Sequence, residues 1–381
     1  MLRWTEPARP AGLVTSERAS RAAEARPGAA FATSPDGGWD AFVAATPGGD
    51  VVQSTAWAEA KRALGFEVEP VVVRRGGDIV GGARIVIRRF GPLGGVGYVA
   101  RGPLLAPEAR VALVLDAIEK AARARRVRHL VVQPPQGGDE LAAALAARGY
   151  DAGAPEVTPS ATLRIDLSRS LDQIQAAMTA SKRNQLRRSQ RGGVEVRLAG
   201  VDELGLFHEM HVATAGRQGF APLSRAYLQS QWDALHPRGW VQIFVARHGV
   251  RPLAAIWVTA FGESATYRLP AWTGEGRELQ PNVACQWEAI RWAMAQGFRW
   301  YDFGGIERRH LELIVAGQPL PDSFHRSPDA MKREFGGDPV GFPGSCQRTF
   351  NPLARVLVRA LYPRLSRNGP LHRLIHRLRN G

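Results

Sequence analysis

Lysine is rare in this chain, and its positions are the first ones to consider for chemistry. Of the 50 basic residues among 381, only four are lysines: Lys61, Lys120, Lys182 and Lys332. Arginine elsewhere serves wherever any cation suffices, so a retained lysine is a candidate for a place where a compact ammonium is preferred to a planar guanidinium.

Two further groups of residues could take part in chemistry. Tyr301 and Asp302, in WYDFGG, lie where an expected strand ends in two glycines, and such loop-proximal positions often carry functional side chains. The stretch SKRNQLRRSQR, residues 181–191, has five cations in eleven residues. It indicates either a contact with nucleic-acid phosphates or a solvated helix face.

Several common catalytic motifs are absent from the sequence. GGVGYVA, residues 94–100, fits GxGxxA, but Pro103 follows too soon for the helix that a nucleotide fingerprint needs. There is no P-loop, G-x-S-x-G or H-E-x-x-H, and His208 with His211 lacks an obvious third metal ligand. What remains favours a transferase that works by positioning and electrostatics.

The expected elements repeat. Residues 71–87, VVVRRGGDIVGGARIVI, correspond to residues 243–259, IFVARHGVRPLAAIWVT, and each expected hairpin precedes a helix and a short apolar strand (127–134 and 299–305). A duplicated α/β unit is the interpretation we favour. Two unrelated hairpins with similar turns are the alternative.

Composition restricts the class of protein further. The formal net charge is +15, and the segment 351–381 contributes seven arginines and no acidic residue, which favours polyanionic or phosphate-bearing partners. The longest apolar runs reach about half a membrane span. Residues 1–38 lack the apolar core of a signal peptide and indicate a disordered extension. Two cysteines form no disulfide framework, so we expect a cytoplasmic protein.

Six motifs follow one another over roughly residues 50–350: QSTAWAEAKRALGFEVEPVVV, YVARGP, SKRNQLRRSQRGGVEV, TAGRQGF, WYDFGGIE and MKREFGGDPV. In this order they resemble the Fem family of tRNA-dependent, non-ribosomal peptidyltransferases, which attach amino acids to peptidoglycan precursors. The resemblance is to FemX-type members without a coiled-coil arm. It implies an α/β (α+β) fold with two tandem GNAT-like domains, at 39–158 and 159–345, and a basic helical tail, 346–381, that returns to the first domain.

The resemblance also implies a function. An amino acid would pass from aminoacyl-tRNA, the co-substrate, to an amine of a UDP- or lipid-linked muropeptide. Alternatives are the same transfer onto a peptide-type antibiotic, an acyl-CoA-dependent GNAT N-acyltransferase, and a non-catalytic RNA- or membrane-binding protein. No metal or other cofactor is implied. We expect a monomer, with peripheral contact at the inner membrane face as an option.

The site residues follow from the resemblance together with the residue patterns above. Lys332 would stabilise the oxyanion or the leaving ribose oxygen. Asp302 would orient or deprotonate the amine, or would only cap the following turn. Lys61 and Arg217 would bind acceptor phosphate, and acceptor contacts are further expected from Tyr98, Arg101, Tyr227 and Tyr301. The expected tRNA contacts are Lys182, Arg183, Arg187 and Arg188.

Two departures from the family pattern stand out. Met331 precedes Lys332 where the family usually has Phe. The segment TGEGRELQPNVACQW, residues 273–287, stands where acetyl-CoA-using GNAT enzymes carry a pyrophosphate loop, and it does not fit that loop. The second departure favours an acyl donor other than acetyl-CoA.

Overall fold

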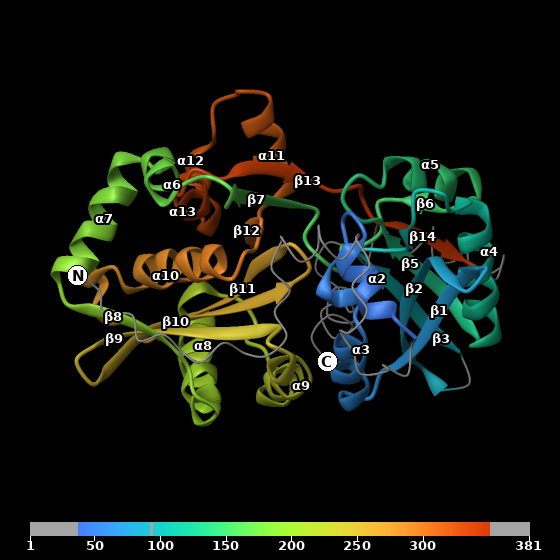
Figure 1. Cartoon of the computed structure of the whole chain (residues 1–381), viewed down its shortest axis with the longest axis horizontal. Helices are drawn as coiled ribbons and strands as arrows, with labels where there is room; N and C mark the ends of the chain where they lie inside the picture. The colour runs from blue at the N-terminus through green and yellow to red at the C-terminus, as the bar shows by residue number, and fades with distance from the viewer. Residues whose placement is uncertain (1–36, 92–93, 351–381) are drawn as a thin grey trace. The chain divides into compact units, whose positions relative to one another are not determined.

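The computed structural model describes residues 37–91 and 94–350, and the chain divides into two compact units (Figure 1). The C-terminal unit spans Ala161–Gly341. The N-terminal unit contains, of the described residues, 37–160 and 342–350. The expected domain boundaries stay predictions. The expected disordered extension up to residue 36 and the Arg-rich segment from 351 lie outside the described residues.

The N-terminal unit is built on a seven-stranded sheet with the order β1-β2-β3-β5-β14-β6, and β4 pairs with β2. Its strands are β1 (Glu67–Arg75), β2 (Asp78–Arg89), β3 (Gly95–Ala100), β4 (Leu104–Leu105), β5 (Val127–Gln133), β6 (Asp151–Ala152) and β14 (Cys346–Thr349). Its helices are α2 (Trp39–Ala45), α3 (Thr55–Ala63), α4 (Val111–Ala124) and α5 (Asp139–Ala147).

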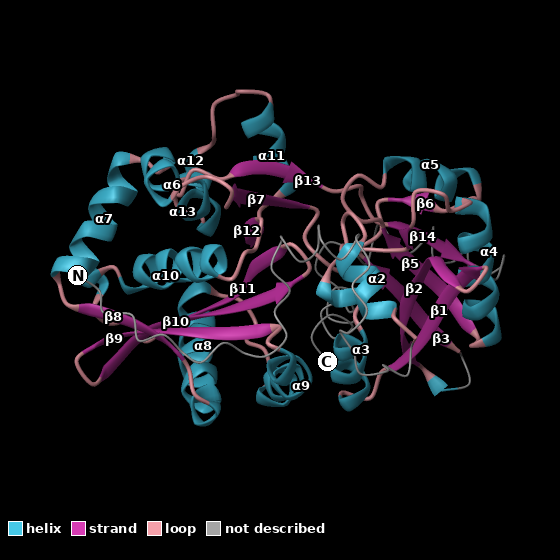
Figure 2. Cartoon of the chain, viewed as in Figure 1, coloured by secondary structure: helices cyan, strands magenta, loops and turns pink. Residues whose placement is uncertain are grey.

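The C-terminal unit has a seven-stranded sheet with the order β13-β7-β12-β11-β10-β9-β8. The strands are β7 (Ala161–Asp166), β8 (Val194–Leu198), β9 (Val241–His248), β10 (Arg251–Phe261), β11 (Ser264–Trp272), β12 (Trp300–Gly305) and β13 (Asp338–Gly341). The helices are α6 (Leu171–Ala177), α7 (Ala180–Arg191), α8 (Leu204–Gln218), α9 (Arg225–Leu235), α10 (Pro281–Ala295), α11 (Arg308–Val315), α12 (Asp322–His325) and α13 (Pro328–Arg333). Helix α10 covers one face of the sheet, and α8 and α9 lie on the other (Figure 2).

The two sheets follow one plan. In each, a hairpin (β1-β2 or β9-β10) pairs antiparallel with a third strand, which runs parallel to a fourth strand after a helical crossover. An antiparallel strand follows at the next position: β14 beside β5, and β7 beside β12. The repeat is the one that the matching hairpin sequences predict, and the expected mixed α/β fold is confirmed.

The parallel pairs of the two units differ. In the N-terminal unit, β3 pairs with β5 along its whole length, from Gly95 to Ala100. In the C-terminal unit, the ladder between β11 and β12 has three pairs and ends at Thr266–Asp302, although both strands continue. The end of β12 is therefore where polar groups can approach the sheet of the C-terminal unit.

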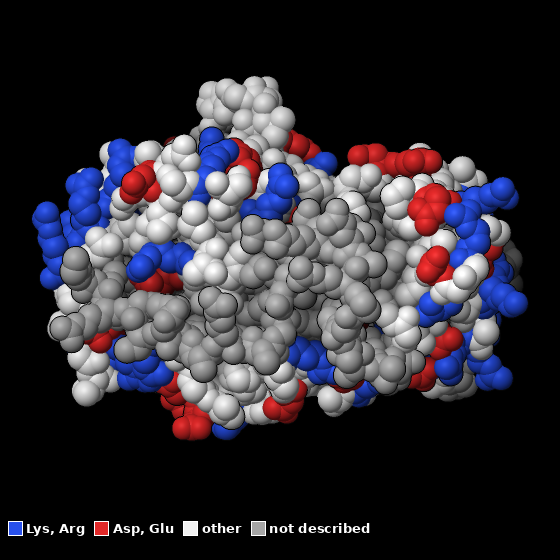
Figure 3. All heavy atoms as spheres, viewed as in Figure 1, with Lys and Arg blue, Asp and Glu red and all other residues white. Residues whose placement is uncertain are grey.

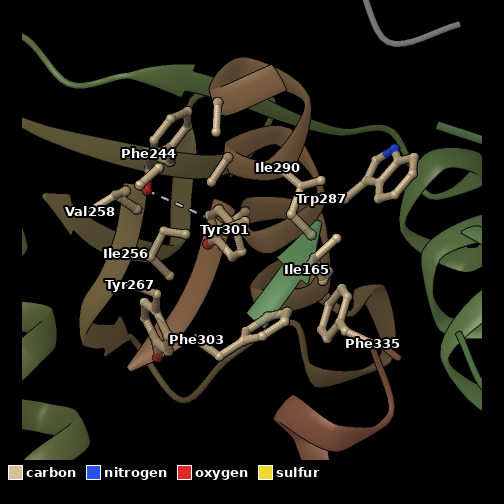
Figure 4. Close-up of a cluster of buried hydrophobic side chains, with 14 of the residues drawn as sticks. Ile165, Phe244, Ile256, Val258, Tyr267, Trp287, Ile290, Tyr301, Phe303 and Phe335 are labelled. Carbon is tan, nitrogen blue, oxygen red and sulfur yellow. Dashed lines mark hydrogen bonds between the residues drawn. The ribbon is translucent and has the colours of Figure 1, made fainter. Parts of the chain in front are cut away.

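An aromatic core fixes the elements around that strand end. Tyr301 and Phe303 of β12 lie with their ring centroids 5.2 Å apart, and Phe303 is 5.2 Å from Phe335, which follows α13 (Figure 4). All three side chains are fully buried. Met331 is half-buried and packs against the same core, so this departure from the family pattern is accommodated by hydrophobic contact.

Candidate active site in the C-terminal unit

Asp302 lies at the last pair of the β11–β12 ladder and is buried. One carboxylate oxygen accepts hydrogen bonds from the Thr162 hydroxyl (2.5 Å) and the Gly304 main-chain N–H (2.8 Å). The other accepts from Arg164 Nε at 2.6 Å. Three donors on one buried carboxylate fix its orientation. Of its two expected roles, the contact with Gly304 supports capping of the turn.

Lys332 lies on α13, and its ammonium donates a hydrogen bond to the carbonyl oxygen of Gly305, at the end of β12. Burial lowers the pKa of Lys332 below its usual 10.5, and the nearby carboxylates of Asp329 and Asp302 act in the opposite direction. The structure thus places an ammonium close to the end of β12 and to the carboxylates of Asp302 and Asp329. The catalytic roles expected of Lys332 and Asp302 stay predictions.

Asp329 and His310 complete this polar group. One oxygen of Asp329 is 2.7 Å from His310 Nδ1 and accepts the Glu307 N–H at 2.9 Å. Both side chains are buried. We name Thr162, Arg164, Asp302, His310, Asp329 and Lys332 the strand-end cluster.

The segment that carries Lys332 is anchored on both sides. Phe335 enters the core, and the main-chain N–H of Thr179 donates to the carbonyl of Glu334 at 2.9 Å. Gly336 has a φ of +82°, and a Cβ there would lie 2.4 Å from the carbonyl oxygen of Ala177. Only glycine fits this close approach without strain.

Lys182 was expected to contact tRNA, and the structure contradicts this. Its side chain is buried, and its ammonium lies 3.0 Å from Glu334 Oε2 and 2.8 Å from Gln185 Oε1. Burial lowers the pKa of Lys182, while Glu334 opposes the shift. The basic helix turns this residue toward the segment of Lys332, where its charge is neutralised by an ion pair.

Arg183 also makes structural contacts within the C-terminal unit. Its guanidinium donates to the main-chain carbonyls of Ala176 and Met178, at the C-terminal end of α6, where the unpaired carbonyls of a helix attract cations. Arg187 and Arg188, by contrast, are exposed on α7, together with Arg191. These three remain available for the predicted tRNA contact.

Tyr301 was expected to line the acceptor site, but it is fully buried and its hydroxyl donates to Gln286 Oε1 at 2.6 Å. Burial raises the pKa of this phenol well above 10.0. Strand alternation explains the error: neighbouring residues point to opposite faces, so Tyr301 faces α10 while Asp302 faces the cluster.

Arg217 is exposed at the end of α8, and its guanidinium donates to the carbonyls of Trp272 and Thr273. It also lies 4.9 Å above the Trp272 ring. Tyr227, in the first turns of α9, is buried. Their acceptor roles stay predictions.

The remaining expected residues lie in the N-terminal unit. Lys61, on α3, is buried, with its ammonium 5.3 Å from the Phe66 ring and 5.9 Å from the Trp57 ring. Tyr98 is buried in β3. Arg101 is buried after β3, where it donates to the Pro159 carbonyl at 2.5 Å and stacks 3.4 Å from the Phe342 ring. Their roles also stay predictions.

Sequence reasoning missed Thr162, Arg164, His310 and Asp329. Thr162 and Arg164 belong to a strand about 140 residues before Asp302, so no local pattern joins them. Asp329 precedes Lys332 by three residues, which places both on one helix face. This i, i+3 spacing could have indicated from the sequence that Asp329 lies near Lys332.

No helix in residues 37–91 and 94–350 is long and apolar enough to span a bilayer. Over the same residues, no group of three His, Cys, Asp or Glu is arranged to hold a metal ion.

Both units match known protein families. A model described as the FemAB family matches residues 36–141, and one described as acetyltransferase (GNAT) domain matches residues 177–310. Lipid II:glycine glycyltransferase of Staphylococcus haemolyticus (strain JCSC1435) is 23% identical over 405 residues, covering 86% of this chain and 94% of that protein. Together these matches support a Fem-family protein with two GNAT-like units.

Other matches agree with this Fem-family assignment. Lipid II:glycine glycyltransferase of Staphylococcus aureus (strain MRSA252) is 26% identical over 221 residues, which are 55% of this chain and 52% of that protein. The crystal structure of FemX superposes with a TM-score of 0.75 at 20% identity, covering 85% of this chain and 98% of that one. L-PGS from Bacillus licheniformis has a TM-score of 0.52 at 13% identity, covering 86% and 97%.

The two structural matches show a shared fold, and the named relatives are transferases. The expected family, the tandem GNAT-like fold and the enzyme class, aminoacyltransferase, are confirmed.

Proposed function

We propose that this Fem-family enzyme transfers an amino acid from aminoacyl-tRNA to an amine of a lipid- or UDP-linked peptidoglycan precursor. The observation that carries the proposal is the match to a lipid II:glycine glycyltransferase along 94% of that protein. The strand-end cluster supports it, because it supplies an ammonium where a transferred acyl group needs electrostatic stabilisation.

The chemistry is an ester aminolysis. The acceptor amine attacks the ester carbonyl carbon of the aminoacyl group, the C–N bond forms, and the carbonyl oxygen becomes an oxyanion. Collapse breaks the bond to the ribose oxygen, which receives the proton lost by the amine. The Lys332 ammonium stabilises the negative charge on these oxygens, a task typically worth about 10²–10³ in rate.

Asp302 has a positioning role in this scheme. Its carboxylate already accepts hydrogen bonds from Thr162, Arg164 and Gly304, so both of its oxygens are engaged in holding neighbouring groups. It holds the end of β12 in shape beside Lys332. The proton of the amine is carried by the leaving ribose oxygen or by water.

The donor tRNA is proposed to bind along α7. Arg187, Arg188 and Arg191 are exposed on this helix, and Figure 3 shows basic side chains gathered over it at the left edge of the view. Lys182, on the same helix, pairs with Glu334 of the Lys332 segment. A tRNA bound on α7 would therefore contact a helix that is itself paired with the segment carrying the proposed catalytic ammonium.

Replacing Arg187, Arg188 and Arg191 together by Gln should weaken tRNA binding and flatten its salt dependence. Each lost phosphate contact removes about 0.7–0.9 from the slope of log K against log salt. Binding is measured by filter retention at several salt concentrations. The matched control replaces Arg75, Arg110 and Arg128, three exposed arginines of the N-terminal unit, by Gln. Equal slopes for the two triple variants would contradict the α7 site.

An acyl-CoA donor is the main alternative, and the start of α10 argues against it. Pro281, the first residue of α10, has no N–H. The N–H groups of Val283 and Ala284 both donate to the Gln280 carbonyl, at 3.1 and 3.3 Å. A pyrophosphate needs free amides at a helix start, so this geometry supports a different donor.

On the acceptor side, Lys61 and Arg217 are proposed to bind phosphate of the precursor. Both are cations that lie against aromatic rings, Phe66 and Trp57 for Lys61 and Trp272 for Arg217. Such contacts hold the charged end of each side chain in a fixed position. A phosphate-bearing secondary metabolite would offer the same acceptor chemistry.

The proposal is tested with purified protein, charged total tRNA and an acceptor. Lipid-linked muropeptide, UDP-linked muropeptide and a precursor without the amine are compared, and the products are read by mass. We expect one aminoacyl residue to be added to a muropeptide, only when the tRNA is charged. Transfer from acyl-CoA in place of tRNA, or no product with any muropeptide, would overturn it.

A further inference from the structure

Helix α13 holds the end of β12 at two points. The Lys332 ammonium donates to the carbonyl of Gly305, and the Asp329 carboxylate accepts the N–H of Glu307 at 2.9 Å. Gly305 is the last residue of β12, and Glu307 follows it by two residues. One turn of α13 therefore fixes both the strand end and the ammonium that points at it.

His310 supports the carboxylate from the opposite side. It lies in the first turn of α11 and is buried, with Nδ1 2.7 Å from Asp329 Oδ2. Its ring meets Phe324 edge-on, with centroids 5.0 Å apart. Because a carboxylate only accepts hydrogen bonds, the Nδ1 atom carries the proton and the ring orientation is fixed.

We propose that Asp329, held in place by His310, is the positioning residue that keeps the Lys332 ammonium charged and directed at the end of β12. The role of that ammonium in transfer rests on the proposed function. The position of the Asp329 carboxylate does not depend on that function, because it follows from the contacts with His310 and the Glu307 N–H.

The charges around Lys332 explain why Asp329 matters most. The groups that face it are Asp302 on β12 and Asp329 on the same helix, with His310 and Glu307 reaching it through Asp329. Asp302 shares its charge with the Arg164 guanidinium at 2.6 Å. Asp329 is held by an imidazole and a main-chain amide, so more of its negative charge is left to act on Lys332.

The test observes the ammonium directly. Only four lysines are present, so Nζ-labelled lysine gives a simple NMR spectrum, in which the Lys332 signal is assigned by its loss in Lys332→Met. The titration midpoint of that signal is compared in the wild type, Asp329→Asn, His310→Leu and His310→Asn. Asp322→Asn, at an exposed residue of α12, is the control.

We expect Asp329→Asn to lower the Lys332 midpoint by about one pH unit, because it removes an opposite charge at close range. His310→Leu should lower it in the same direction. His310→Asn, whose amide can replace the Nδ1 donor, should restore it, and Asp322→Asn should leave it unchanged. If Asp329→Asn fails to fold, the two His310 variants decide.

A Lys332 midpoint that is the same in wild type, Asp329→Asn and His310→Leu overturns the inference. Transfer assays separate this from the proposed function. If Asp329→Asn moves the midpoint but the wild type transfers no amino acid, the inference stands and the proposed function fails. If the wild type is active, Asp329→Asn should reduce kcat and move the alkaline limb of its pH profile to lower pH, with an unchanged KM for the acceptor.

Discussion

Lys332→Met should abolish transfer, with a loss of about 10²–10³ in kcat and little change in the affinity for the acceptor. The ester and the neutral amine of the ground state offer an ammonium little to stabilise, so its contribution grows as negative charge develops on the ester oxygens. An interaction made only in the transition state lowers kcat and kcat/KM together and leaves binding intact. Steady-state kinetics with charged tRNA and a muropeptide measure both constants.

The same variant should keep its fold. Met roughly preserves the length of the apolar stem, and burial already disfavours the ammonium, as the lowered pKa of Lys332 shows. A lowered lysine pKa means that the folded state binds fewer protons than the unfolded state. Unfolding free energy should therefore rise with pH between the folded pKa and 10.5 in the wild type, and less so in Lys332→Met.

Lys120→Met is the matched control, because Lys120 is exposed on α4. It should retain wild-type kcat and KM. If Lys332→Met raises KM at an unchanged kcat, Lys332 binds substrate and does not stabilise the transition state.

Gly336→Ala should destabilise the C-terminal unit by about 3 kcal/mol. The residue has a φ of +82°, and the new Cβ would lie 2.4 Å from the Ala177 carbonyl oxygen and 2.7 Å from its carbon. A left-handed backbone costs an L-residue about 1–2 kcal/mol, and relieving the clash by a backbone shift adds a similar amount. Urea unfolding measures the loss.

Gly317→Ala separates the two contributions. Gly317 also has a positive φ, +63°, but nothing lies within 4 Å of its ideal Cβ, so only the dihedral cost of about 1 kcal/mol applies. If both variants lose the same free energy of unfolding, the backbone around Gly336 shifts to accommodate the new Cβ and the clash adds no measurable destabilisation. Because Gly336 follows Phe335 and Lys332, its variant should also reduce transfer in whatever fraction remains folded.

The repeated elements were predictable from sequence because they depend on local periodicity. The two hairpins share a pattern of alternating apolar residues around a glycine turn, and each precedes a helix and a short strand. The structure has this arrangement in β1-β2 and β9-β10. Motif order indicated the family, and the rarity of lysine together with the family resemblance indicated Lys332 as a candidate for chemistry.

The partners of these residues could not be read in the same way. Lys182 belongs to a helix whose exposed face is strongly basic, yet it pairs with Glu334, 152 residues later in the chain. The fourth and fifth strands of the N-terminal sheet, β5 and β14, come from residues about 220 apart. Helices α11–α13, which carry His310 and Asp329, were not predicted at all.

The sequence by itself therefore determined the repeat, the family and the chemical nature of the ammonium, because these follow from residue types and spacing within short windows. Only the tertiary structure decided which cations are free to bind a substrate. A buried charge must be paired or hydrogen-bonded, and its partner comes from the segment, often distant in sequence, that packs beside it. For that reason Lys182 and Arg183 became structural residues, while Asp329 and His310 entered the site beside Lys332.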